Sequence, residues 1–359
     1  VAAGVLYPFT GTLLAPGHDT RHASLQFEAV GLRLDASHQQ VTPEVLDALG
    51  RAQQANGEIN QAMASFNKLQ GLMPGSPMPL LRLANAQVAN KDVPAAMQTL
   101  RKALELQPNL LLAQRGLVEM AVRSNQSTVA LEVSKTVQQQ RPKEPAGYVL
   151  EGDVHMAGKN WGSAVAAYRA GLKAAPAPEL AMKLHAALSA DGKAADAERV
   201  TAEWMKANPR DAGVPLFLGD RAIAAKRLPD AQRHYERVIA LQPNNAVALN
   251  NLAWVAGQLG RSDAIALAER ANQAAPNQPA FMDTLAVLLS DKNEHARALE
   301  LQKRVVALQP QVPLFKFNLA RIHIKAGEKA QARPLLDELS ALGDKFNRQA
   351  EVDELKKGL

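Results

Sequence analysis

Histidines and carboxylates are the side chains in this sequence from which chemistry would be expected, and their spacing argues against a reactive centre. His18 and His22 lie four residues apart, the spacing of two metal ligands on one helical turn. Pro16 and Gly17 immediately precede them, however, and no third ligand follows at a suitable distance. The other histidines are scattered and do not converge on one site. We therefore predict that the chain binds no metal and no cofactor.

Motifs for phosphate binding or covalent catalysis are absent from the sequence. The segment Gly158-Lys159-Asn160 lacks the upstream glycine spacing of a phosphate-binding loop. No H-E-x-x-H, G-x-S-x-G or dinucleotide-binding signature occurs. The chain contains no cysteine, which excludes disulfides, thiolate catalysis and cysteine-ligated metals. These observations predict that the 359 residues do not form an enzyme.

Proline recurs along the chain at a nearly constant interval. The series consists of Pro74, Pro108, Pro142, Pro176, Pro209, Pro243, Pro276 and Pro310. The steps between its members are 34, 34, 34, 33, 34, 33 and 34 residues. Such a period indicates one supersecondary unit copied along the chain, so we predict a repeat array and not a compact enzyme core.

Two further positions in each unit predict a pair of closely packed helices. An alanine stands shortly before each proline, at a constant phase, and its single methyl group lets two helix backbones approach. These alanines are Ala62, Ala96, Ala130, Ala164, Ala197, Ala231, Ala264 and Ala298. Earlier in most units a leucine precedes a small residue, as in Leu218-Gly219. We therefore expect two antiparallel helices per unit, with the proline at the exit.

Short turn signals separate the two expected helices. A Gly or Asn there can adopt the left-handed φ that ends a helix, as in Ala55-Asn56-Gly57 and Ala157-Gly158-Lys159. The units that end at Pro209 and Pro276 are one residue shorter than the others. We expect the missing residue to fall in this turn between the two helices.

Composition and charge agree with an all-α fold and exclude several partner classes. Hydrophobic residues make up 47% of the chain but aromatic residues only 4%, which suits closely packed helices with small contact residues. The net charge is +6, with basic and acidic residues interspersed, which argues for solubility and against nucleic acid. No apolar run reaches the length of about 18 residues that a membrane span needs.

The combination of these positions resembles the tetratricopeptide repeat. That pattern pairs Leu-Gly in a first helix (helix A) with Ala, a large apolar residue and Pro in a second (helix B), and Leu218, Gly219, Ala231, Tyr235 and Pro243 match it in phase. The resemblance implies an all-α, right-handed superhelix of about nine helix-turn-helix repeats plus a C-terminal capping helix. We expect an irregular or degenerate N-terminal segment at 1–42, the array at 43–341 and the capping helix at 342–359.

The resemblance also implies a concave groove lined by the A helices, in which a protein partner would lie as a peptide or helix. Groove positions of the family map onto Asn85, Arg115, Glu119, Asp153, Asp220, Asn250, Trp254, Asp283, Phe317 and Arg321, with Asn251 and Asn318 alongside. Asn side chains both donate and accept, so they can bind an extended backbone. Trp254 is a candidate aromatic anchor. The alternative is that the polar residues are merely solvated and that Trp254 and Phe317 belong to the core between repeats.

The C-terminal third is similar to the PEP-CTERM system TPR-repeat protein of the PrsT type. The segments that carry this similarity are 248–254, 267–271, 281–286 and 342–346. The similarity implies a non-enzymatic scaffold for exopolysaccharide or sorted-protein export, in the periplasm or envelope; without it, a cytoplasmic location is expected. One alternative is a targeting arm of a larger enzyme such as a glycosyltransferase. Another, RNA binding, conflicts with the acidic residues Glu119, Asp153, Asp220 and Asp283 among the groove positions.

Overall fold

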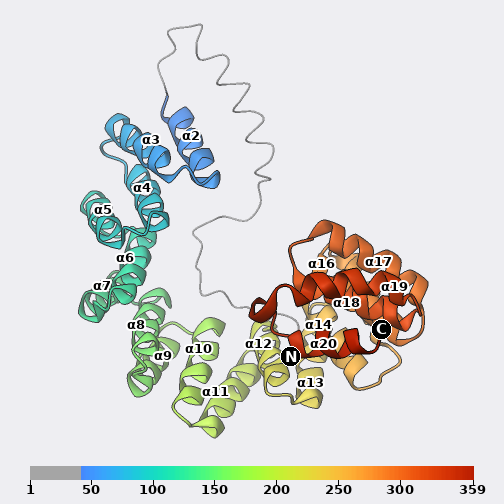
Figure 1. Ribbon diagram of the computed structural model, residues 1–359. Coiled ribbons are helices and arrows are strands. Elements are labelled where there is room, and N and C mark those ends of the chain that lie inside the picture. Colours follow the sequence, from blue (N-terminus) through green and yellow to red (C-terminus); the bar gives the residue numbers. More distant parts are fainter. Residues whose placement is uncertain (1–41) are drawn as a thin grey trace, which may run out of the picture. The chain divides into compact units, whose positions relative to one another are not determined.

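The computed structural model describes residues 42–359, and every regular element in that range is a helix (Figure 1). The predicted all-α fold is confirmed. The described residues form two compact units, 42–204 and 205–359. The segment expected to be irregular, and the pair His18 and His22, lie outside the described residues except for Thr42. Thr42 is the N-cap of the first helix, where its hydroxyl accepts a hydrogen bond from the amide of Val45 at 3.4 Å.

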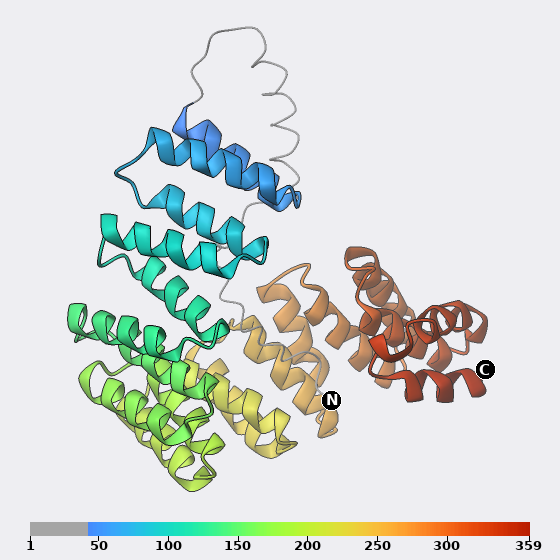
Figure 2. The same cartoon turned by 60° about the vertical axis from the view of Figure 1, so that its left-hand side comes forward.

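Helices in the first unit alternate between A and B roles. The A helices are α2 (Pro43–Ala55), α4 (Met78–Ala89), α6 (Leu111–Arg123), α8 (Ala146–Ala157) and α10 (Pro178–Ala190). The B helices are α3 (Ile59–Leu72), α5 (Val93–Leu106), α7 (Ser127–Gln140), α9 (Trp161–Ala174) and α11 (Ala194–Ala207), the last of which runs past the unit boundary. Each pair stacks against the next, as Figure 2 shows for α2 to α9.

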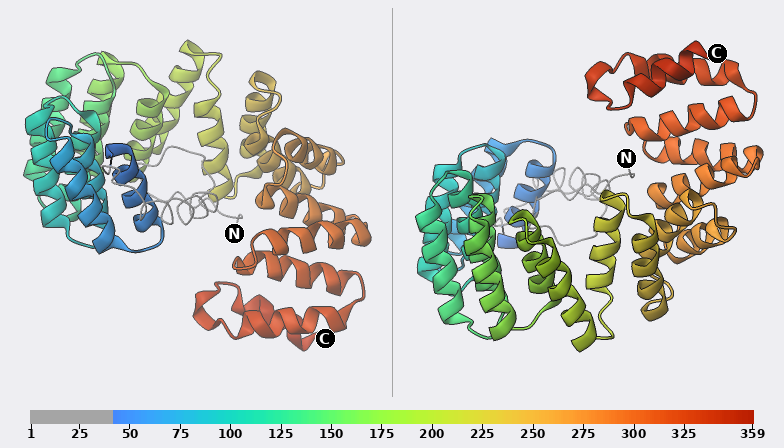
Figure 3. Two further views of the ribbon diagram at one scale, coloured as in Figure 1. Left: turned by 90° about the horizontal axis from the view of Figure 1, so that it is seen from above. Right: turned by 90° about the horizontal axis from the view of Figure 1, so that it is seen from below.

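The second unit continues the alternation. Its A helices are α12 (Gly213–Ala224), α14 (Ala246–Gln258), α16 (Pro279–Asp291) and α18 (Pro313–Lys325). Its B helices are α13 (Leu228–Leu241), α15 (Ala264–Ala274), α17 (His295–Leu308) and α19 (Lys329–Ser340). A short 3-10 turn, η1 (Gly343–Lys345), and a final helix, α20 (Gln349–Lys357), close the chain, and both appear at the red end of the ribbon in Figure 3.

Small residues hold the two helices of each pair close together, as the sequence predicted. Every alanine of the repeated series is at most 3% exposed. On the facing A helix, a Cβ added to Gly152 would lie 2.1 Å from Cε1 of Tyr168, and one added to Gly219 would lie 2.6 Å from the same atom of Tyr235. Real side chains cannot approach so closely, so the glycine makes room for the aromatic ring of helix B.

The turn between helices A and B has the same backbone conformation in all nine described pairs. One residue in each turn has a left-handed φ, between 57° and 81°. These residues are Gly57, Lys91, Asn125, Lys159, Gly192, Lys226, Gly260, Asn293 and Gly327. In the signal at 157–159 the left-handed residue is Lys159 and not Gly158, because the amide of Asn160 bonds to His155 O and fixes the register of the turn.

The expectation that the two short units lose a residue between their helices is wrong for one unit and right for the other. The unit ending at Pro209 is shortened before its A helix, where only residues 175–177 separate α9 from α10, one or two fewer than at the other B-to-A connections. The unit ending at Pro276 is shortened directly after its left-handed residue, because Ala264 follows Gly260 by four residues, whereas Ala231 follows Lys226 by five. The hydrogen-bond pattern that ends helix A is kept in both units.

The C-terminal helix covers the last pair of the array. Val352 of α20 is fully buried and Leu355 is half-buried, together with Phe317, Leu336 and Leu339 of α18 and α19. Phe346 lies between η1 and α20 and is buried against Phe317, with ring centroids 5.8 Å apart. The apolar end of the array is thereby shielded from water.

Candidate partner-binding face of the A helices

Contacts between repeats place the A helices on the inner side of each unit. Helix α6 contacts α8 directly, and α14 contacts α16, which in turn contacts α18. The B helices of the same repeats make less contact with their successors. In a curved stack the elements on the inside of the curve lie closest together, so the A helices form the concave side in each unit. The predicted groove residues all belong to A helices.

The structure places the predicted groove residues at three levels of exposure. Arg115 and Glu119 are exposed on α6. Seven are half-buried: Asn85, Asp153, Asp220, Asn250, Asn251, Trp254 and Arg321. Asp283 and Asn318 are each only 6% exposed, and Phe317 is fully buried. Phe317 is therefore a core residue, and the expectation that it contacts a partner is corrected by its packing against Phe346 and α19.

A buried polar cluster around Asp283 joins two consecutive repeats. Asp283 of α16 accepts a hydrogen bond from Nε2 of Gln302 at 2.6 Å and two from Nδ2 of Asn318, both at 2.9 Å. Gln302 lies on the B helix of the same repeat and Asn318 on the A helix of the next. Burial raises the pKa of Asp283 to about 6, against the opposing effect of these hydrogen bonds and of Arg321 and Arg348.

An equivalent cluster surrounds Asp220 on α12. The Tyr235 hydroxyl on α13 donates to Asp220 at 2.6 Å, and Nδ2 of Asn251 on α14 donates to the same carboxylate at 3.2 Å. Burial raises the pKa of Asp220, and the two hydrogen bonds oppose this shift. The predicted residues Asp220, Asn250 and Asn251 are thus brought together, because Nδ2 of Asn250 also donates to Asn251 at 3.3 Å.

The first unit repeats the arrangement at Asp153. Its carboxylate accepts from the Tyr168 hydroxyl at 2.5 Å and from Nζ of Lys183 at 2.7 Å. Burial and the neighbouring Asp153 raise the pKa of Tyr168, which therefore stays protonated as the donor. A carboxylate on helix A, a donor on the paired helix B and a donor on the next helix A thus recur in both units. These clusters hold neighbouring A helices in register.

Sequence reasoning placed the donors Asn251 and Asn318 on this face but missed the donors Tyr168, Tyr235, Gln302 and Lys183. Tyr168 and Tyr235 each follow the bonded aspartate by 15 residues, and this constant offset is the signal that would have identified them. Gln302 follows Asp283 by 19 residues, one helical turn farther on the same face. Lys183 follows Asp153 by about one repeat length along the sequence, and only this separation could have indicated it.

Two guanidinium groups lie over the ring of Phe317. The Cζ atom of Arg321 is 5.8 Å and that of Arg348 is 5.3 Å from the ring centroid. Arg348 precedes α20 and also pairs with Glu351 at 3.6 Å. Arg321 makes no hydrogen bond or ion pair within residues 42–359. Its donors are therefore available to another molecule, whereas Phe317 serves as the surface that orients the two guanidinium groups.

Among the described residues, no group of three or more His, Asp or Glu side chains could hold a metal ion. None of the helices from α2 to α20 is both long and apolar enough to cross a membrane.

Comparison with known proteins identifies the repeat. Models described as tetratricopeptide repeat match residues 48–110, 234–265 and 289–357. A curated relative, cellulose synthase operon protein C of Pseudomonas fluorescens (strain SBW25), is 26% identical over 157 residues, which cover 41% of this chain. The match spans only 12% of that relative's length.

Solved structures with a similar fold include the APC/C hetero-tetramer Cut9-Hcn1, with a TM-score of 0.48 and 15% identity over 94% of this chain and 67% of that chain. Another is MamA 41-end from Desulfovibrio magneticus RS-1, with a TM-score of 0.37 and 17% identity over 46% of this chain and 93% of that chain. The family matches fall in both structural units, at helix pairs that share one packing pattern and one turn geometry. The helix pairs within the three matched ranges are similar to tetratricopeptide repeats, and the other described pairs share their packing and turn geometry.

Proposed function

We propose that this chain is a non-enzymatic scaffold that binds an extended segment or a helix of a partner protein along the concave face of its A helices. The observation that carries the proposal is the set of hydrogen-bonded polar side chains on that face. Its carboxylates are tied to the neighbouring repeats, so the surface is preorganised, and preorganisation lowers the entropic cost of binding. Asn250 and Trp254 remain partly exposed above these clusters.

Asn250 also offers a specific contact. Its side-chain oxygen is buried and accepts no hydrogen bond within the described residues. Leaving such an acceptor without a partner costs about 1–3 kcal/mol. Rotation of the Asn250 side chain would turn this acceptor toward a backbone amide of a bound segment, and the ring of Trp254, one turn further along α14, would pack against the same segment.

The proposed setting is a machinery that exports polysaccharide or sorted proteins through a bacterial envelope. Two likenesses support this setting. Residues 240–350 resemble the PEP-CTERM system TPR-repeat protein, and the matched curated relative is named a cellulose synthase operon protein. In this setting the array would hold a partner in place while other proteins carry out the chemistry.

The proposal is tested by capturing partners from envelope extract on two matched double variants of the full chain. We expect the groove variant, Asn250→Ala with Trp254→Ala, to lose at least one partner that the wild type retains, by about tenfold, since interface anchors typically contribute more than 1 kcal/mol each. The control variant, Lys102→Ala with Arg169→Ala, changes exposed residues of B helices α5 and α9 and should retain every partner. Quantitative mass spectrometry measures both. Equal retention by the two variants would reject the A-helix face.

A further inference from the structure

One edge of the first unit is apolar at two consecutive connections between helix pairs. Within residues 42–204 the exposed large apolar side chains are Leu72, Met78, Leu106 and Leu112, which are between 40% and 53% exposed. Leu72 ends α3 and Met78 begins α4, while Leu106 ends α5 and Leu112 lies in the first turn of α6. In Figure 2 the α3-to-α4 and α5-to-α6 connections lie one above the other on the same side of the stacked pairs. These four side chains form an apolar edge.

The opposite edge of the same unit is polar. The A-to-B turns on that side contain only glycine and polar or charged residues, at 56–58, 90–92, 124–126, 158–160 and 191–193. Single exposed apolar residues are ordinary on a protein surface, but four gathered at neighbouring connections are not. The contrast between the two edges indicates that another molecule covers the apolar one.

Lysines lie directly behind the apolar edge. Lys68 stands four residues before Leu72, and Lys102 stands four residues before Leu106, so each is about one helical turn from the end of its helix. Both lysines are exposed, and neither makes a hydrogen bond or an ion pair with residues 42–359. Their ammonium groups are therefore available to an anion outside the chain.

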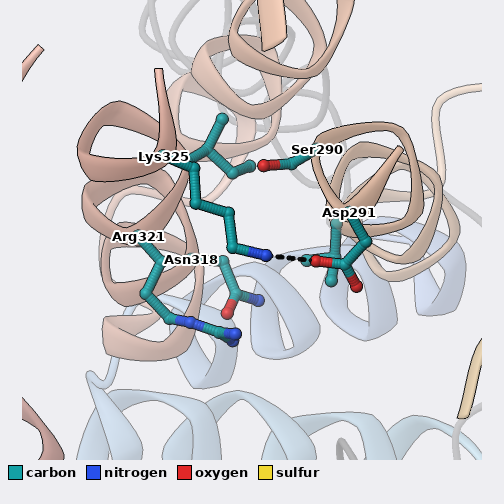
Figure 4. Close-up of a pocket in the computed structure, with 7 residues that line it drawn as sticks. Ser290, Asp291, Asn318, Arg321 and Lys325 are labelled. Atoms are coloured by element: carbon teal, nitrogen blue, oxygen red, sulfur yellow. Dashed lines mark hydrogen bonds and ion pairs between the residues drawn. The ribbon is translucent and has the colours of Figure 1, made fainter. Parts of the chain in front are cut away.

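Basic side chains of the second unit provide a contrast. At the repeat position of the two lysines, Arg270 donates to the carbonyl of Pro243 at 3.0 Å. Lys325 pairs with Asp291 on the neighbouring A helix, as Figure 4 shows. These cations are bonded within the chain, whereas the two lysines behind the apolar edge are not.

Few carboxylates offset the positive charge at the edge. Residues 66–79 contain no Asp or Glu, and Glu105 is the only one in residues 100–113. Arg101 adds a third positive charge to those of the two lysines. The edge thus combines apolar side chains at its tip with a net positive charge behind them.

We propose that the apolar edge binds the surface of a lipid bilayer that contains anionic lipids. The apolar side chains at the helix ends would enter the boundary between headgroups and acyl chains, to a depth of about 5–10 Å. The two lysines lie about 6 Å further back along their helices, level with the anionic headgroups. Their aliphatic stems can follow the apolar surface while the ammonium groups remain in water.

Shape favours a bilayer over a protein as the occupant. The four side chains stand within one turn of helix ends, so they form a crest and not the floor of a groove. A fluid lipid surface adapts to a crest, whereas a protein partner needs a complementary hollow of its own. The edge is distinct from the concave face of the A helices. The inference therefore goes beyond the proposed function and does not rest on it.

Sedimentation of the full chain with vesicles tests the inference. The probes are vesicles of phosphatidylcholine alone and vesicles in which about one third of the lipid is phosphatidylglycerol. We expect the wild type to bind the anionic vesicles about tenfold more tightly than the neutral ones, because each lysine near an anionic surface favours binding about fivefold before screening. Added salt should reduce this preference.

Serine variants test the contribution of the apolar side chains. Leu72→Ser with Leu106→Ser should weaken binding to anionic vesicles about tenfold, since two apolar side chains no longer leave water. The matched control is Val247→Ser with Leu308→Ser in the second unit. These residues are 47% and 49% exposed, but each is the single exposed large apolar residue at its connection, so the control should bind as the wild type does.

Glutamine variants test the contribution of charge. Lys68→Gln with Lys102→Gln should reduce the preference for anionic over neutral vesicles several-fold. Lys135→Gln with Arg169→Gln removes the same net charge from exposed positions of α7 and α9 and should retain the preference. Unchanged thermal unfolding shows that each variant is folded.

A fluorescent label gives a second measurement that does not depend on these variants. The chain contains no cysteine, so one introduced cysteine can carry an environment-sensitive fluorophore. With the label at Leu72→Cys, we expect the emission to shift to the blue when anionic vesicles are added. With the label at Asn90→Cys, in a polar turn of the opposite edge, we expect no shift.

Three results would overturn the inference. They are equal binding of the wild type to both kinds of vesicle, equal loss of binding in the serine variant and its control, and no shift from the label at Leu72→Cys. If the serine variant instead loses a captured protein and keeps its vesicle binding, the edge belongs to a protein partner. The capture experiment on Asn250 and Trp254 changes a different surface, so either proposal can fail without the other.

Discussion

Replacing Tyr235 with alanine is expected to lower the free energy of unfolding by about 4 kcal/mol. The side chain is fully buried, and its ring lies against the backbone of Gly219. Its removal leaves a large cavity between α12 and α13, which Gly219 cannot fill. The hydroxyl also donates to Asp220, whose half-buried carboxylate would keep only the longer bond from Asn251. Urea unfolding followed by circular dichroism measures the loss.

The matched control is Tyr235→Phe, which keeps the ring and removes only the hydroxyl. We expect it to cost about 1–2 kcal/mol, the contribution of one hydrogen bond to a charged acceptor. Because each repeat touches mainly its neighbours, amide exchange should accelerate most in α12 to α14 in both variants. Equal destabilisation by Phe and Ala would show that the close packing of ring and glycine does not stabilise the pair.

The stability of the second unit is expected to fall as pH rises from 4 to 8, because of Asp283. Its pKa is about 6 in the folded chain, compared with 3.8 for an aspartate that is not buried. The folded state therefore binds this proton more tightly than the unfolded state does. The resulting stabilisation is complete below pH about 4 and is lost as pH rises through 6, and it amounts to about 3 kcal/mol.

Other carboxylates also titrate in this range, so the quantity to measure is a difference between variants. Relative to Asp283→Asn, the wild type should lose about 3 kcal/mol of unfolding free energy between pH 4 and pH 8. Asp263 is the control, because a hydrogen bond from Arg261 lowers its pKa. Relative to Asp263→Asn, the wild type should instead gain stability as pH rises to about 4 and stay nearly constant from there to pH 8. If the difference in unfolding free energy between the wild type and Asp283→Asn does not change with pH, the burial of that carboxylate is contradicted.

Much of the fold follows from the spacing of small and cyclic residues. The repeated alanines are buried between paired helices, and Gly152 and Gly219 leave room for the rings of Tyr168 and Tyr235. The left-handed turn residues were harder to assign. Glycine usually identifies such a position, yet Lys91, Lys159 and Lys226 occupy it in three repeats. There the hydrogen bonds of the turn outweigh the conformational preference of lysine.

The sequence predicted which helices form the candidate site, but it did not predict the burial and contacts of each residue there. The repeat phase placed Asp153, Asp220 and Asp283 on helix A, while their burial depends on donors one helix and one repeat away. Phe317 has the phase of a groove residue, but the chain after α19 folds back and covers it with Phe346. Contacts with residues outside the repeats do not follow the repeat period, so the period alone does not predict them.

The central claim is that a partner lies along the A helices, and site-specific photo-crosslinking tests it most directly. A photoreactive phenylalanine analogue is placed at Asn250 on α14, at Arg115 on α6, or at Arg169 on the B helix α9. We predict that a captured partner crosslinks from Asn250 or Arg115 and not from Arg169. A crosslink from Arg169 alone would contradict the claim and place the partner on the outer face of the repeats.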